Sequence, residues 1–149
     1  MTQPEKIIAL DLGDRWIGVA MSDPLGFFAK PFTTVQAYEL DDFLAKTIEQ
    51  HQIRTIVVGY PKTLRNTESE QTKKVIARAN QLKEKFPTIE WVWWDERLTS
   101  KHAASLKKEK TKEDKVHSHA VAAAVILQNY LEHLRYKKEL EKRDDQSDD

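Results

Sequence analysis

The residues of this chain most suited to chemistry are acids at the ends of apolar runs. Asp11 lies in a nearly continuous apolar run that Gly13 ends, and Asp95 and Glu96 follow a second such run. An ionised carboxylate in this setting is costly unless it is paired, hydrogen-bonded or bound to a cation. Because neighbouring strand residues face opposite sides, only one of Asp95 and Glu96 can face the same site as Asp11.

Two histidines provide a further candidate ligand. His117 and His119 come just before, or in the first turn of, a helix predicted from Ala120. Carboxylate and imidazole both bind divalent metals, and the chain has no cysteine that could supply a thiolate. The spacing alone leaves alternatives open, because strand-end acids also form caps and salt bridges. It also leaves His117 open as a rival to His119.

The pattern of apolar residues predicts the elements that must position these groups. Strands are expected over residues 6–12, 16–21, 27–35, 54–58 and 89–94, and helices over 39–51, 67–86, 99–106 and 120–134. Gly13 and Gly18 are expected to serve a turn and a close packing contact. An antiparallel meander followed by β-α-β units predicts an α/β fold, with a five-stranded mixed sheet flanked by helices.

Length and composition fit one domain with a real core. The chain has 149 residues, of which 40% are hydrophobic. We expect the domain over residues 1–136 and a frayed or disordered charged tail over 137–149. No apolar run approaches the roughly 20 residues that span a bilayer, and the N-terminus does not resemble a signal peptide. Together with the lack of cysteine, these features fit a protein of the reducing cytoplasm.

Zero formal net charge argues against a generic polyanion binder, but the charge is unevenly distributed. A lysine-rich segment spans residues 101–115, and the chain ends in an acidic stretch. The candidate nucleic-acid contacts are Lys62, Arg65, Arg97, Lys107, Lys108 and Lys110, with Lys73 and Lys74 as further members of a groove or of a solvated face. Arg97 could instead pair with Asp95. The tryptophans at 91, 93 and 94 could stack on bases, although strand tryptophans more often belong to the core.

Four blocks, in order along the chain, resemble the YqgF family (RuvX-like), a group of Holliday-junction resolvases or pre-16S ribosomal RNA nucleases. The blocks are ALDLG at 9–13 with IGVA at 17–20 and SD at 22–23, VVGYP at 57–61, WDERLTS at 94–100, and AAAVILQNYL at 122–131. Of these blocks, WDERLTS is the most specific. The family has a ribonuclease H-like fold, which matches the element order read from the pattern.

The resemblance implies roles for three residues. Asp11 matches the first-strand catalytic aspartate, and Glu96 matches the glutamate of the Asp-Glu-Arg-Leu motif. The family's third acid precedes the glutamine of the last helix by nine residues, and counting back from Gln128 gives His119. The predicted catalytic and metal-binding set is therefore Asp11, Glu96 and His119. Magnesium prefers oxygen ligands, whereas imidazole favours manganese or later metals.

The implied function is divalent-metal-dependent phosphodiester hydrolysis, with Mg²⁺ or Mn²⁺ as the cofactor. The resemblance favours 5′-end processing of pre-16S rRNA, with pre-ribosomal particles as partners, over cleavage of branched DNA. A nucleic-acid-binding module in which His119 marks a decayed site is the non-catalytic alternative. We expect a monomer or a weak homodimer that acts away from membranes.

Overall fold

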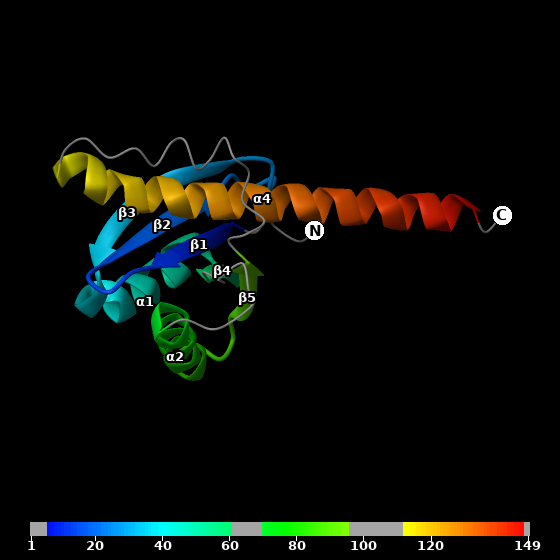
Figure 1. Cartoon of the computed structure of the whole chain (residues 1–149). Coiled ribbons are helices and arrows are strands. Elements are labelled where there is room, and N and C mark those ends of the chain that lie inside the picture. Colours follow the sequence, from blue (N-terminus) through cyan, green and yellow to red (C-terminus); the bar gives the residue numbers. More distant parts are fainter. Residues whose placement is uncertain (1–5, 61–69, 96–111, 148–149) are drawn as a thin grey trace.

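The computed structural model describes residues 6–60, 70–95 and 112–147 (Figure 1). Its sheet has the strand order β3-β2-β1-β4-β5. β1, β2 and β3 are antiparallel neighbours, and β4 and β5 run parallel to β1. The bounds are Ile7–Leu12 for β1, Trp16–Ser22 for β2, Ala29–Gln36 for β3, Thr55–Tyr60 for β4 and Glu90–Asp95 for β5.

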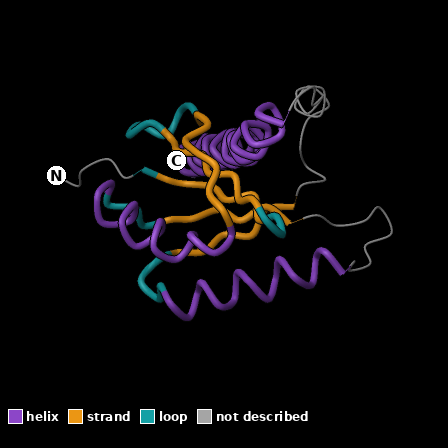
Figure 2. Tube along the Cα trace, turned by 90° about the vertical axis from the view of Figure 1, so that its left-hand side faces the viewer, coloured by secondary structure: helices purple, strands orange, loops and turns teal. Residues whose placement is uncertain are grey.

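Helices cover both faces of this sheet (Figure 2). The described helices are η1 (Ala37–Glu39), α1 (Leu40–His51), α2 (Glu70–Lys85) and α4 (Lys112–Ser147). Alternate residues of a strand face opposite sides, so Ile8 and Leu10 of β1 pack with α1 and α2. Ala9 of β1 and Val57 of β4 pack with α4 on the other face. The expected α/β fold with a five-stranded mixed sheet is thus confirmed.

The face toward α4 is built largely from small side chains. Ala9 and Ala20 of the sheet meet Ala123 and Ala124 of the helix, and all four are buried. Small residues on both sides let a helix approach a sheet closely. This close approach brings the N-terminal half of α4 over the ends of β1 and β2.

The elements predicted from the pattern agree with the observed ones within a few residues, except the last helix. α4 begins at Lys112, so His119 lies in its third turn and not in or before its first. The helix has 36 residues, about 54 Å in length, and runs well past the sheet (Figure 1). It ends at Ser147, within the segment expected to be frayed or disordered. The helix expected over 99–106 lies outside the described residues.

None of the helices in the described ranges is long and apolar enough to cross a membrane.

Candidate active site

Asp11 occupies the centre of a row of paired residues near the end of β1. It pairs with Gly18 of β2 and with Gly59 of β4, and Gly59 in turn pairs with Trp94 of β5. Paired positions on adjacent strands present their side chains to the same face. Asp11 is therefore flanked by two glycines, which add no side chain beside its carboxylate. Its side chain is 23% exposed.

His119 of α4 lies over this row. Its Nδ1 is 3.9 Å from Oδ2 of Asp11, and its side chain is 33% exposed. The contact depends on Gly18, because a Cβ at that position would overlap the carbonyl oxygen of His119. A glycine on β2 thus lets the helix backbone approach closely enough for its imidazole to meet the carboxylate of β1.

The separation of these two groups is short enough for one cation to contact both. Two ligand atoms that each lie about 2.1 Å from one metal ion are at most about 4.2 Å apart. The observed 3.9 Å lies within that span, and both side chains are partly open to solvent. Glu96, the third expected ligand, lies outside the described residues. Among the residues that are described, no group of three acids or histidines comes together around one point.

Asp95 is excluded from this site by the register of β5. It pairs with Tyr60, one position beyond the Gly59–Trp94 pair. Asp95 therefore belongs to the sheet face that carries Trp91, which packs with α1 and α2. Asp11 belongs to the face covered by α4, so the two aspartates cannot share one ion.

With this geometry in place, the comparisons with known proteins identify the family. The family model described as "RuvX: Holliday junction resolvase" matches residues 5–133. This chain belongs to the RuvX family. A relative from Phocaeicola vulgatus, named "Putative pre-16S rRNA nuclease", is 38% identical over 136 residues, which cover 88% of this chain and 98% of the relative. A relative of the same name from Rubrobacter xylanophilus is 37% identical over 134 residues, covering 89% and 96%.

Solved structures establish the fold of this RuvX-family chain. RuvC of Thermus thermophilus in complex with a Holliday junction substrate has a TM-score of 0.62 at 11% identity, covering 89% of this chain and 96% of RuvC. A second structure of Thermus thermophilus RuvC gives 0.59 at 12% identity with the same coverage. The expected ribonuclease H-like fold is confirmed.

The tryptophans of β5 divide between core and surface. Trp91 donates its indole N–H to the carbonyl oxygen of Phe86 at 3.1 Å. Trp94 packs edge-to-face on Tyr130 of α4, with ring centroids 5.9 Å apart, and lies 5.6 Å from the ring of His133. Trp93 is 38% exposed. Trp91 and Trp94 are partly buried and pack against the core on opposite faces of the sheet, and Trp94 contacts α4 at the end of β5.

Gln128 joins α4 to the loop before β3 by hydrogen bonds, a role that the sequence pattern did not reveal. Its Oε1 accepts the backbone N–H of Ala29 at 2.9 Å, and its Nε2 donates to the carbonyl oxygen of Phe27 at 3.2 Å. The loop that it grips is itself ordered by Asp23, whose carboxylate accepts the N–H groups of Phe27 and Phe28. Gln128 lies nine residues beyond His119, about 13.5 Å along the helix. These hydrogen bonds therefore anchor α4, the helix that carries His119, to the loop before β3.

The remaining expected contacts lie outside the described residues. These are Lys62, Arg65, Arg97, Lys107, Lys108 and Lys110. His117 lies within α4, but its side chain is outside the described part as well. Lys73 is exposed and pairs with Glu70 one turn earlier on α2, at 3.7 Å, as expected of a solvated helix face.

Proposed function

We propose that this RuvX-family chain is a divalent-metal-dependent nuclease that hydrolyses phosphodiester bonds of precursor RNA, in 5′-end processing of pre-16S rRNA. The observation that carries the proposal is the meeting of Asp11 and His119, far apart in the chain, 3.9 Å from each other. The names of the relatives at 38% and 37% identity support the choice of precursor rRNA over branched DNA. The proposed place of action is the cytoplasm, as a monomer or weak homodimer on pre-ribosomal particles.

In this proposal Asp11, His119 and Glu96 hold the metal. A bound divalent cation makes a water molecule more acidic and neutralises charge on the leaving oxygen. Asp11 contributes a carboxylate near the end of the central strand β1, where its side chain is 23% exposed. His119 faces Asp11 with Nδ1, so the ligating tautomer carries its proton on Nε2.

The presence of a histidine in place of a third carboxylate points to manganese. Imidazole binds Mn²⁺ and later transition metals better than Mg²⁺, which prefers oxygen. The substitution also leaves the site with one less negative charge. We therefore propose that Mn²⁺ supports cleavage better than Mg²⁺ in this chain. The basic residues Lys62, Arg65, Arg97, Lys107, Lys108 and Lys110 are proposed to dock the polyanion near the acids.

Two alternatives rest on specific observations. The family description and the RuvC complex with a Holliday junction favour a junction-cleaving DNA endonuclease. The histidine at position 119 favours a binding module that has lost catalysis.

One assay separates these functions. Labelled pre-16S leader RNA, an unrelated RNA hairpin and a four-way DNA junction are incubated with the wild type and with Asp11→Asn, in Mg²⁺ or Mn²⁺. The proposal predicts Mn²⁺-dependent cleavage of the leader RNA that Asp11→Asn abolishes. Cleavage of the junction alone supports the resolvase, and RNA binding without cleavage in either metal supports the binding module.

A further inference from the structure

A small cavity lies beside the candidate active site, on the other face of the sheet. It has a volume of about 180 Å³, lies between the β1–β2 turn and α2, and is partly open to solvent. Gly13 and Asp14 of the turn line one part of it, and Lys74 and Arg78 of α2 line another, together with apolar residues of β1, β2 and α2. Neither the metal site nor the expected basic loops account for this cavity.

Positive charge dominates the cavity. Lys74 and Arg78 are four residues apart on α2, so they are neighbours on one face of the helix. Asp14 is the one carboxylate among the lining residues. Lys74 is exposed and makes no ion pair with another described residue. A compact anion could therefore meet a lysine ammonium and an arginine guanidinium together.

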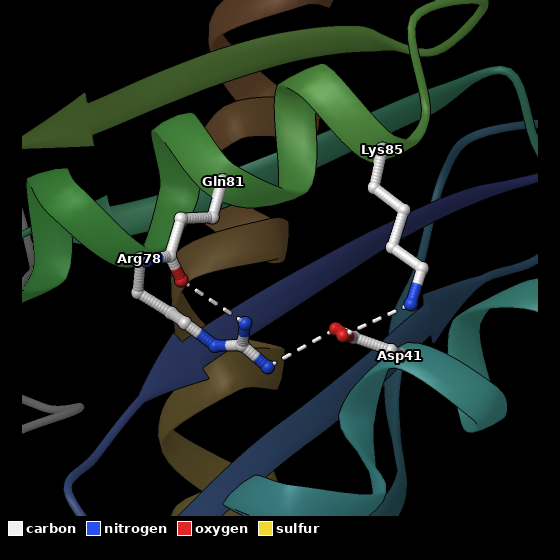
Figure 3. A network of polar contacts seen from close by, with 4 residues as sticks. All are labelled: Asp41, Arg78, Gln81 and Lys85. Atoms are coloured by element: carbon white, nitrogen blue, oxygen red, sulfur yellow. Dashed lines mark hydrogen bonds and ion pairs between the residues drawn. The ribbon is translucent and has the colours of Figure 1, made fainter.

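The guanidinium of Arg78 is held in place from outside the cavity (Figure 3). It donates to Oδ1 of Asp41 on α1 at 3.0 Å and to Oε1 of Gln81 at 3.4 Å. These bonds use two of its five N–H donors, so donors remain for a ligand. Asp41 also accepts from Lys85 at 3.1 Å through its other oxygen. The carboxylate of Asp41 thus pairs with both Arg78 and Lys85, so these three residues together carry a net positive charge.

The cavity is close to the cleavage site along the chain. Asp11 and Gly13 are two residues apart, about 7 Å along a strand. Asp11 faces α4, whereas the cavity faces α2, so a bound strand would pass around the end of β1 to reach both. This distance of about 7 Å between Asp11 and the cavity suits a phosphate that neighbours the cleaved one on the same strand.

We propose that this cavity is a subsite for a backbone phosphate of the nucleic-acid strand that is cleaved at Asp11. The inference rests on the proposed nuclease function. It gives Lys74, expected from the sequence in a groove or on a solvated face, a specific phosphate contact, and it adds Arg78. Arg78 binds the phosphate oxygens through paired N–H donors, and Lys74 acts as a mobile point charge. Asp41 is a positioning residue that orients the guanidinium.

The test is RNA binding by charge-removing variants with a matched control. Fluorescence anisotropy of a labelled RNA hairpin with a single-stranded 5′ extension is measured in Ca²⁺ over a range of salt concentrations. The variants are Lys74→Gln, Arg78→Gln and Lys85→Gln. Lys85 has the same charge as Arg78 and the same partner, Asp41, but does not line the cavity. Thermal unfolding of each variant checks its fold.

The proposal predicts that Lys74→Gln and Arg78→Gln each raise Kd about five- to tenfold. Each should also lower the slope of log K against log salt by about 0.7–0.9, as expected for one lost phosphate contact. Lys85→Gln should stay within twofold of the wild type, and Lys74→Arg should restore binding. Lys74→Gln leaves the Asp41 network intact, so it tests the subsite even if Arg78→Gln unfolds the protein.

Three results would overturn the subsite. In the first, Lys74→Gln and Arg78→Gln bind RNA like the wild type. In the second, all three variants lose affinity equally, which would indicate bulk charge alone. In the third, millimolar inorganic phosphate raises the Tm of the wild type but not that of Lys74→Gln, while Lys74→Gln does not change the Kd for RNA. The cavity would then bind a free anion and not a phosphate of the RNA. If the wild type binds neither RNA nor DNA, the proposed nuclease function itself is wrong. This outcome distinguishes failure of the proposed function from failure of the subsite alone.

Discussion

The backbone of His119 rests directly on Gly18, so closely that a Cβ on this glycine would overlap the histidine's carbonyl oxygen. Gly18 pairs with Asp11 across β1 and β2. One glycine contact therefore sets the distance between the two described residues of the candidate metal site.

Replacing Gly18 with alanine tests this contact. The added Cβ must push α4 away from β2, and overpacking of this kind costs about 1–3 kcal/mol of the free energy of unfolding. The variant should also bind Mn²⁺ more weakly, because His119 moves away from Asp11. Urea denaturation and metal titration provide the two measurements.

Gly26→Ala is the matched control for that variant. Gly26 has a φ of 76° and no heavy atom within 4 Å of a Cβ, so alanine there costs about 1–2 kcal/mol through the backbone alone. Its Mn²⁺ affinity should equal that of the wild type. Equal metal affinity in Gly18→Ala and Gly26→Ala would show that the glycine contact does not position His119.

The hydrogen bonds between Gln128 and the backbone of Phe27 and Ala29 are expected to contribute to the stability of the fold. Gln128→Leu removes the acceptor of the Ala29 N–H and the donor to the Phe27 carbonyl, so the free energy of unfolding should fall by about 1–3 kcal/mol. Gln81→Leu serves as the control, since Gln81 makes an exposed contact of 3.4 Å and should change stability by less than about 0.5 kcal/mol. Similar losses in both variants would count against a special role for Gln128.

Asp23 should give the protein a pH-dependent contribution to stability. The N–H of Phe28, followed by that of Phe27, lowers the pKa of the Asp23 carboxyl below its ordinary value of 3.8. A lowered pKa in the folded state means that this stabilisation is present above about pH 4 and is lost as pH falls through the folded-state pKa. The Tm difference between the wild type and Asp23→Asn should therefore be constant from pH 5 to 7 and shrink below pH 4. A difference that does not change over this whole range would contradict the assignment.

His119→Asp tests the metal preference. A carboxylate restores an oxygen ligand and a negative charge, so cleavage in Mg²⁺ should increase relative to cleavage in Mn²⁺ by about tenfold or more. The measurement is the ratio of the initial rates in the two metals. An unchanged ratio would mean that residue 119 does not contact the ion.

The sequence pattern predicts the strands well because apolar runs end at clear turns. Strand β3 begins at Ala29 and not at Phe27, since Asp23 takes the N–H groups of Phe27 and Phe28 into the turn. The pattern does not predict the helix beyond residue 134, because residues 137–144 are nearly all charged, are exposed and carry no apolar stripe. Hydrophobic periodicity cannot detect a helix that packs on nothing.

The candidate site could be predicted only in part from local pattern. The position of Asp11 within an apolar run singled it out, and the resemblance to the YqgF family selected His119. Their proximity depends on α4 crossing β1 and β2, a long-range relation that spacing does not encode. The cavity beside Lys74 likewise forms only when α2 packs against the β1–β2 turn.

The central claim is that Asp11 and His119 hold the same cation. Isothermal titration calorimetry of Mn²⁺ binding tests this claim most directly. The proteins compared are the wild type, Asp11→Asn, His119→Ala and the double variant, and circular dichroism checks the fold of each. We expect each single substitution to weaken binding by at least about tenfold and the double variant to be little worse than Asp11→Asn, because both ligands serve one ion. Mn²⁺ affinity in folded Asp11→Asn equal to that of the wild type would contradict the account.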